Sequence, residues 1–394
     1  MSRDFFEFYC PVKIVAGYKA LEHIPFELGV RGVSKPMIVT DKGVSEAGIV
    51  EIVRNSMREG GSDVIDVFDD VPADSPIEQV VAAAHAYRSS GCDSVIAIGG
   101  GSVMDTAKAV NVLVTEGGDD LTPYIGVNNL TRPLKPFVAI PTTAGTGSEV
   151  TSVSVVKDSS SGAKVPLMSQ YLLPDVAVID PRMTQKLPPI ITAATGMDAL
   201  THAIESFICL GKNPMSDAYA SGAIARIGRW LIPVLDDPSN TEGRLELAQA
   251  ATMAGIAFSN SMVGLVHSLG HALGAVAGVH HGTCMSIFLP HVLAYNRESR
   301  KHQIGELLLY LAGAEAFART AVDDRAAHVI EQIVELKNGI HERCGLPRTL
   351  SETGKVSREQ LPRIRDLALD DGSLLMNPVE AEAGDIDRLL ELAW

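Results

Sequence analysis

The spacing of hydrophobic and polar positions divides the chain into two halves. Up to about residue 190, short β-branched runs alternate with amphipathic segments such as residues 77–90. This alternation is typical of parallel strands joined by crossover helices. Strands are expected at residues 36–41, 63–68, 94–98, 137–140 and 176–179.

From about Pro189 onward, Ala- and Leu-rich helical periodicity replaces the strand pattern. The sequence therefore predicts an α/β nucleotide-binding domain over residues 1–189 and an all-α domain over residues 190–394. The stretch Asp158-Ser-Ser-Ser-Gly162 is expected to be a surface turn inside a hairpin. Helices of the second half are expected at residues 193–210, 214–235, 243–259 and 263–276, with several more before Trp394.

Composition narrows the range of partners. The 394 residues are 46% hydrophobic and 21% charged, so the chain can bury a large core. Its net charge of −15, without a Lys/Arg-rich run, argues against nucleic acid or a membrane surface and favours small molecules. No apolar stretch approaches the ~18 residues of a membrane span, and the acidic N-terminal segment does not resemble a signal peptide, so a cytoplasmic location is expected. Five cysteines without close pairs are expected to be reduced thiols.

Asp198, His202, His267 and His281 are candidate metal ligands. Asp198 and His202 stand four residues apart, which places them on one face of a helix, and the two later histidines lie in Gly-containing segments. Three imidazoles and one carboxylate suit Fe(II), Zn(II), Mn(II) or Co(II), not calcium, and leave a position for a substrate oxygen. A single histidine is more often an ordinary core residue, but the combined pattern favours a metal site. A zinc protease is a poor interpretation, because Ser268 stands where that motif has a glutamate.

Two polar loops follow expected strands in the first half. The loop Gly99-Gly100-Gly101-Ser102 opens a helix, so its backbone could approach a pyrophosphate, although such a sequence could also be a tight turn. The second loop carries Thr142, Thr143 and Thr146. Ligands of open α/β sheets lie beyond the carboxyl ends of the strands, so both loops are expected to flank one crevice.

Asp41 ends the first clear strand. A carboxylate there would accept a hydrogen bond from the ribose 2′-hydroxyl and repel a 2′-phosphate, which favours NAD over NADP. A purely structural role at the start of a turn is the alternative.

Several motifs stand in register along nearly the whole chain. Together they resemble the iron-containing (group III) alcohol dehydrogenase family, whose fold is shared with dehydroquinate synthase. The motifs are Gly99-Gly-Gly-Ser-x-x-Asp105-x-Ala-Lys, Pro141-Thr-Thr-x-Gly-Thr-Gly-Ser-Glu149, Gly196-x-Asp198-Ala-x-x-His202-x-x-Glu205, Gly264-x-x-His267-x-x-x-His271 and His281-Gly-x-x-x-x-x-x-Leu289-Pro-His291.

The resemblance implies an NAD(P)-binding α/β domain, a helical metal-binding domain and an active site in the cleft between them. It implies that Fe(II) is the expected metal, that His271 lies near the substrate and nicotinamide, and that Phe258 forms an apolar wall of the substrate pocket. Family members commonly form homodimers or larger homo-oligomers. Further dinucleotide contacts are implied for Gly99, Gly100, Gly101, Ser102, Asp105, Thr142, Thr143, Thr146 and Lys164.

The implied reaction moves a hydride between NAD(H) and a small primary alcohol, aldehyde or diol, with the metal acting as a Lewis acid and His271 relaying the proton. A 4-hydroxybutyrate-type hydroxy-acid dehydrogenase, a dehydroquinate synthase-like lyase and a non-catalytic NAD-binding regulator are the alternatives. One departure is visible, because Pro72-Ala73-Asp74-Ser75 stands where many members have Pro-Asn-Pro. Ala73 thus lacks an amide that helps to hold the adenosine side of the cofactor.

Overall fold

The computed structural model describes residues 5–159 and 163–394 and divides them into two compact units. The first unit comprises residues 10–186, and the second comprises residues 187–394 together with residues 5–9. The sequence-based division after residue 189 had placed residues 5–9 in the first domain. The first four residues of the N-terminal segment, and residues 160–162 of the expected hairpin turn, lie outside the described residues.

A six-stranded parallel sheet, in the order β1-β9-β6-β4-β2-β3, forms the centre of the first unit. Four of these strands, β2, β4, β6 and β9, are buried along their whole length. Burial on both faces explains why these segments read as continuous apolar runs in the sequence. The strands are β1 (Lys13–Ala16), β2 (Pro36–Val39), β3 (Asp66–Phe68), β4 (Ser94–Gly99), β6 (Phe137–Pro141) and β9 (Val176–Ile179).

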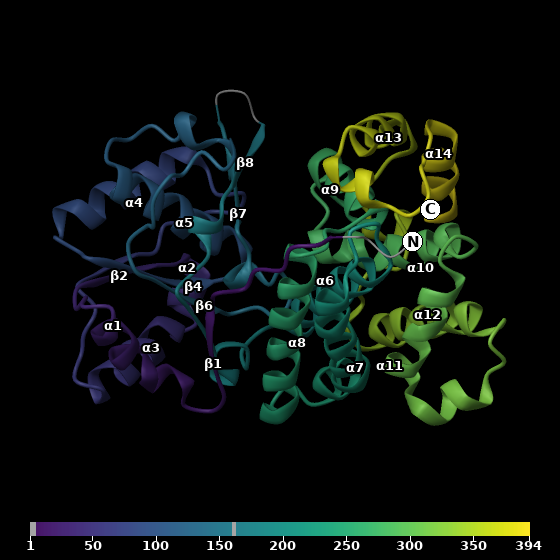
Figure 1. Cartoon of the computed structure of the whole chain (residues 1–394), viewed down its shortest axis with the longest axis horizontal. Helices are drawn as coiled ribbons and strands as arrows, with labels where there is room; N and C mark the ends of the chain where they lie inside the picture. Colours follow the sequence, from purple (N-terminus) through teal and green to yellow (C-terminus); the bar gives the residue numbers. More distant parts are fainter. Residues whose placement is uncertain (1–4, 160–162) are drawn as a thin grey trace. The chain divides into compact units, whose positions relative to one another are not determined.

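Helices cover both faces of this sheet (Figure 1). Successive residues of β4 point to opposite faces, so Val95 and Ala97 pack in one apolar core while Ile96 and Ile98 pack in the other. The first core is completed by α4 and α5, and the second by α1 and α3. The helices of this unit are α1 (Ile24–Val30), α2 (Lys42–Glu46), α3 (Ile49–Glu59), α4 (Ile77–Ser89) and α5 (Gly101–Glu116).

A second, three-stranded sheet lies beside α5. In it β7 (Val153–Lys157) and β8 (Lys164–Met168) pair antiparallel, and β5 (Gly126–Val127) pairs parallel with β8. β7 and β8 are therefore the two antiparallel strands that flank the expected turn, of which residues 160–162 lie outside the described residues.

The second unit is helical, and no strand occurs among its described residues. Its central helix is α6, in which every residue from 192 to 208 is buried. No helix in the described part of the chain is both long and apolar enough to cross a membrane. The five cysteines are free. The helices are α6 (Pro189–Ile208), α7 (Pro214–Asp236), α8 (Thr241–Ser259), α9 (Leu265–Ala277), α10 (His281–Asn296), α11 (Lys301–Arg319), α12 (Arg325–Cys344), α13 (Leu361–Leu369) and α14 (Ala383–Leu392).

Packing around α6 sets the geometry of the helical unit. This helix contacts α7, α8 and α10, and α10 in turn contacts α9. Most residues of α6 are apolar or small, so other helices can enclose it from residue 192 to 208. The α/β unit followed by a helical unit confirms the fold class expected from the sequence.

Candidate metal centre and cofactor loops

Asp198 and His202 project from the same face of α6. Both side chains are almost completely buried, and Asp198 Oδ1 lies 3.8 Å from His202 Nδ1. Their four-residue spacing places them about one helical turn apart, as the sequence predicted.

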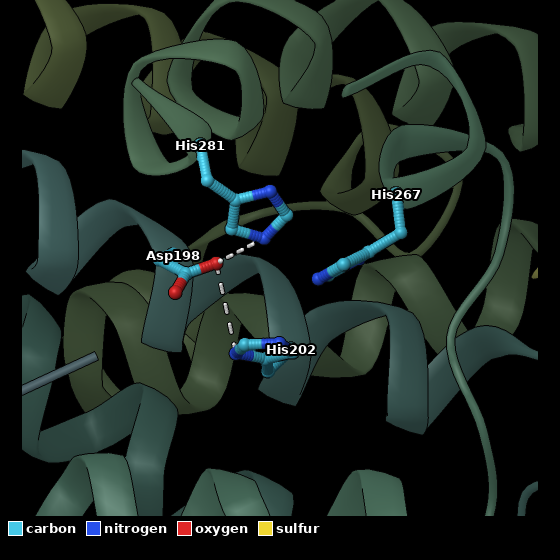
Figure 2. A group of neighbouring side chains, drawn as sticks. All are labelled: Asp198, His202, His267 and His281. Atoms are coloured by element: carbon cyan, nitrogen blue, oxygen red, sulfur yellow. Dashed lines mark ion pairs between the residues drawn. The ribbon is translucent and has the colours of Figure 1, made fainter. Parts of the chain in front are cut away.

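Two further helices bring histidines to the same place (Figure 2). His267 lies in the first turn of α9, and His281 is the first residue of α10. His281 Nε2 lies 3.2 Å from Asp198 Oδ1. The next residue, Gly282, packs directly on α6, where a Cβ atom would stand 2.1 Å from the carbonyl oxygen of Ala194. Only glycine permits this approach, which brings the start of α10 next to Asp198.

The four side chains form a cluster that could hold a metal ion. One donor atom from each of Asp198, His202, His267 and His281 lies within 4.8 Å of the others. Two of the buried ring nitrogens, His202 Nδ1 and His267 Nε2, make no hydrogen bond with the described residues. Buried polar atoms without partners are costly, and a bound cation would satisfy them. The residues therefore fit a first-row divalent ion.

The electrostatics of the cluster suit the same role. Burial lowers the pKa of His202 to about 3 and that of His267 well below its usual value, so both rings are neutral at neutral pH. Burial acts to raise the pKa of Asp198, but the facing imidazoles hold it well below its usual range. Neutral imidazoles and an ionised carboxylate are the forms that ligate metals.

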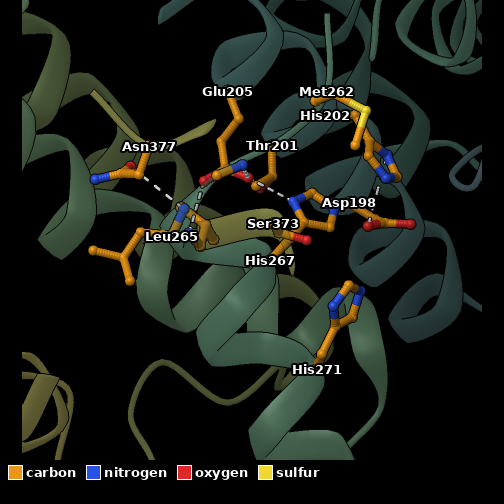
Figure 3. A network of polar contacts seen from close by, with 12 residues as sticks. Asp198, Thr201, His202, Glu205, Met262, Leu265, His267, His271, Ser373 and Asn377 are labelled. Atoms are coloured by element: carbon orange, nitrogen blue, oxygen red, sulfur yellow. Dashed lines mark hydrogen bonds and ion pairs between the residues drawn. The ribbon is translucent and has the colours of Figure 1, made fainter. Parts of the chain in front are cut away.

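Glu205 supports His267 from the same face of α6 (Figure 3). Its Oε2 lies 2.6 Å from His267 Nδ1 and accepts a hydrogen bond from the backbone N–H of Gly264 (3.0 Å). Its Oε1 accepts from the N–H of Val266 (2.7 Å). Burial raises the pKa of Glu205 to about 7, against the effect of these donors. The contact assigns the proton of His267 to Nδ1 and leaves Nε2 to face the cluster.

Phe258 and His271 lie at the edge of the cluster. The Phe258 ring stacks on His202 with centroids 4.3 Å apart and so provides an apolar wall there. His271 stacks on His281 (5.4 Å) and meets the ring of His267 edge-on (5.7 Å), but it is outside the group of four. The roles that the resemblance implied for them, beside the substrate and the nicotinamide, stay predictions.

The two polar loops of the α/β unit lie side by side. Gly99 pairs with Pro141 at the carboxyl ends of β4 and β6, and the N–H of Thr142 donates to the carbonyl of Gly99 (3.1 Å). A Cβ atom on Gly100 would stand 3.4 Å from Thr143, and one on Gly101 would stand 3.3 Å from Thr146.

The glycines thus keep the backbone at the start of α5 open, where the first turn of a helix presents unpaired N–H groups. Ser102 lies in this first turn. The arrangement fits a pyrophosphate.

The remaining predicted cofactor residues have structural partners. Asp41 caps α2 by accepting a hydrogen bond from the N–H of Val44 (2.9 Å), which is the structural role that the sequence left open. Lys164 pairs with Asp74 (2.7 Å).

Asp105 accepts hydrogen bonds from Ser148 Oγ (3.3 Å) and the N–H of Val155 (3.2 Å). Burial raises the pKa of Asp105 to about 6. Its carboxylate therefore anchors the second loop and β7 from inside, and the cofactor contact that the resemblance implied for Asp105 stays a prediction.

The sequence motifs include Glu205 but assigned it no role, and none of them contains Asp371. Glu205 follows Asp198 and His202 at the next position on the same helical face, so the i, i+4, i+7 spacing contained the signal. Asp371 lies 2.9 Å from His271 through its Oδ2 but stands 100 residues away, and no local pattern marks it.

Comparisons with known proteins cover both units. Residues 11–181 match the family model of iron-containing alcohol dehydrogenases, and residues 192–394 match the model of the C-terminal domain of the same family. The chain is 35% identical over 387 residues to an NAD-dependent methanol dehydrogenase of Bacillus methanolicus, covering 98% of this chain and 99% of that protein. It is 34% identical over 396 residues to a 1,3-propanediol dehydrogenase of Citrobacter freundii, covering all of both chains.

Solved structures agree with the sequence matches. The structure of a 1,3-propanediol oxidoreductase superposes with a TM-score of 0.93 at 33% identity, over 99% of this chain and 100% of the other. An alcohol dehydrogenase from Oenococcus oeni superposes with a TM-score of 0.92 at 30% identity, also over 99% and 100%. With family models that match both halves and full-length relatives above 30% identity, the chain belongs to the iron-containing alcohol dehydrogenase family of oxidoreductases.

Proposed function

We propose that the protein oxidises small primary alcohols or diols with NAD⁺, or reduces the corresponding aldehydes with NADH, and that a divalent ion held by Asp198, His202, His267 and His281 is required. The observation that carries the proposal is the convergence of these four donor atoms within 4.8 Å. Two of the ring nitrogens, His202 Nδ1 and His267 Nε2, are buried without a hydrogen bond, which would otherwise destabilise the fold, and a cation would supply the missing partner. When bound, such an ion would favour the alkoxide form of an alcohol or polarise a carbonyl.

The chain's own residues then have distinct tasks. Glu205 orients His267, and Phe258 covers one side of His202. His271, beside the cluster and 45% exposed, is positioned to pass the hydroxyl proton of the substrate toward solvent. With charge stabilisation supplied at the metal centre, no strongly basic side chain is required.

The N-terminal loops support the choice of a dinucleotide as the hydride carrier. Gly100 and Gly101 leave open backbone at the start of α5, and Thr143 and Thr146 stand opposite them. NAD is favoured over NADP, because the carboxylate of Asp41 follows β2 at the same carboxyl edge of the sheet as Gly99 and would repel a 2′-phosphate. Relatives named for NAD support the same choice.

The neighbours of the cluster and the relatives support a small uncharged substrate. The Phe258 ring is an apolar wall beside His202, and the two relatives described above are named for methanol and for 1,3-propanediol. The family models of alcohol dehydrogenases over both halves also favour the dehydrogenase over a lyase.

The test is reduction of NAD⁺ or NADP⁺ by the purified protein with ethanol, propan-1-ol and 1,3-propanediol. The protein is first stripped with a chelator and then reloaded anaerobically with Fe(II), Zn(II), Mn(II) or Co(II). The proposal expects turnover that disappears on stripping and returns with at least one ion, faster with NAD⁺ than with NADP⁺. Absence of turnover with every ion, in protein that binds NAD⁺, would refute it.

A further inference from the structure

Beside the ligand cluster, His271 and Asp371 form a hydrogen-bonded pair. His271 lies one turn after His267 on α9, and its Nδ1 stands 2.9 Å from Asp371 Oδ2. Because the ring also contacts His267 and His281, its orientation is defined from two sides.

Asp371 is itself firmly held. It is the N-cap of the short 3-10 helix η8 (Gly372–Met376), where its Oδ1 accepts a hydrogen bond from the N–H of Ser373 (2.8 Å). A second bond, from Ser268 Oγ to the carbonyl of Ala368 (2.6 Å), ties the preceding residues to α9. One oxygen of Asp371 is therefore used to fix its own segment, and the other is directed at His271.

The pair defines which nitrogen of His271 carries a proton. An aspartate side chain is ordinarily ionised at neutral pH, and Asp371 already accepts one hydrogen bond, from the N–H of Ser373. An ionised carboxylate can only accept hydrogen bonds, so Nδ1 of His271 must donate. In the neutral ring, Nε2 then carries the lone pair.

We propose that Asp371 is a positioning residue for the reaction, which holds His271 in the orientation and tautomer that offer Nε2 to the substrate hydroxyl as a hydrogen-bond acceptor. The inference rests on the proposed function, because it concerns the same site. It adds a residue of the C-terminal segment to a centre otherwise built from α6, α9 and α10. Asp371 exchanges no proton with the substrate, and its effect passes entirely through His271.

The first measurement is ¹⁵N NMR of the histidine rings in the full-length, metal-free protein, with the His271 signal identified by its loss in His271→Gln. Wild-type His271 is expected as the Nδ1–H tautomer. Asp371→Leu, which removes the acceptor, is expected to abolish that preference, whereas Asp371→Asn, which retains an acceptor oxygen, is expected to preserve it.

The second measurement is steady-state kinetics of the metal-loaded variants. For Asp371→Leu we expect kcat to fall by about 10-fold or more, with bound metal and the KM for NAD⁺ unchanged, since proton-transfer groups contribute about 10²–10⁴-fold. Asp371→Asn is expected to restore most of the rate. The matched control is Asp370→Leu at the exposed neighbouring position, which should leave kcat and the ring spectrum unchanged.

Three results would overturn the positioning role. They are a wild-type His271 protonated at Nε2, an active Asp371→Leu variant with the wild-type kcat, and loss of bound metal in parallel with kcat. A wild-type protein that lacks metal-dependent turnover would overturn the proposed function itself, whatever the ring spectra show. The two failures are therefore distinguishable.

Discussion

Glu205 offers the sharpest test of the candidate metal centre, since it touches the cluster only through His267. The substitution Glu205→Gln keeps the size of the side chain and replaces one acceptor oxygen by an NH₂ donor. In the wild-type protein the carboxylate faces three N–H donors, from Gly264 (3.0 Å), Val266 (2.7 Å) and the ring of His267 (2.6 Å). In the variant, at least one of these N–H donors faces the NH₂ group of the glutamine, which is also a donor.

The expected size of the effect follows from that geometry. A buried donor left without an acceptor costs about 1–3 kcal/mol, so the metal-free variant should unfold more easily by this amount. Loss of a carboxylate behind a metal-binding histidine lowers metal affinity by about 10- to 100-fold. At 1.4 kcal/mol for each factor of ten, this corresponds to about 1.4–2.8 kcal/mol.

The assay is an anaerobic titration of metal-free wild-type protein and Glu205→Gln with Co(II), read by visible absorption in competition with a chelator. Glu342→Gln, at an exposed position on α12, removes the same charge and serves as control. Unfolding of each metal-free protein in urea measures the stability loss separately. If Glu205→Gln bound Co(II) as tightly as wild type, the assignment of Glu205 as the group that orients His267 would be wrong.

The other predictions concern both units. Asp198→Ala should lose bound metal and turnover together, whereas His271→Ala should lose turnover and retain the metal. Metal analysis and steady-state kinetics of both variants check this, and stoichiometric metal in Asp198→Ala would contradict the ligand assignment. Lys108 is buried and contacts four oxygens, so Lys108→Met should lower the free energy of unfolding in urea by about 3–5 kcal/mol. A loss below about 1 kcal/mol would argue against a stabilising role of these contacts. Burial alone would raise the pKa of Glu27. The combined effect of its two cationic partners is larger and holds this pKa below the ordinary value of 4.5. Its ion pairs therefore stabilise the fold above that pH and lose their effect as the pH falls through the folded pKa, so Glu27→Gln should lower Tm more at pH 7 than at pH 3, and an equal loss at both would refute this.

The sequence predicted the central parallel strands better than the edge of the sheet. The strands β4, β6 and β9 are buried on both faces, so each appears as an apolar run that ends within one residue of the expected position. By contrast, β1 (Lys13–Ala16) is an edge strand with mostly exposed residues, and its charged and apolar mixture carries no such signal. The small β5-β8-β7 sheet was foreseen only as a hairpin, because β5 is two residues long.

For the site, local spacing was sufficient where the residues share a helix. The pairing of Asp198 with His202 followed from periodicity alone, whereas their meeting with His267 and His281 depends on how α9 and α10 pack on α6. The contact of Asp371 with His271 depends on the path of the chain after α13, which no repeat or motif encodes.

The burial of α6 also has a consequence for engineering this protein. Asp198, His202 and Glu205 share one stripe of a helix that is enclosed from residue 192 to 208, so a one-residue insertion ahead of them would turn all three by about 100°. Libraries intended to change substrate preference should therefore leave α6 untouched. They should instead vary half-buried positions outside α6, such as Phe258 near the end of α8, which packs beside the cluster and supplies no ligand.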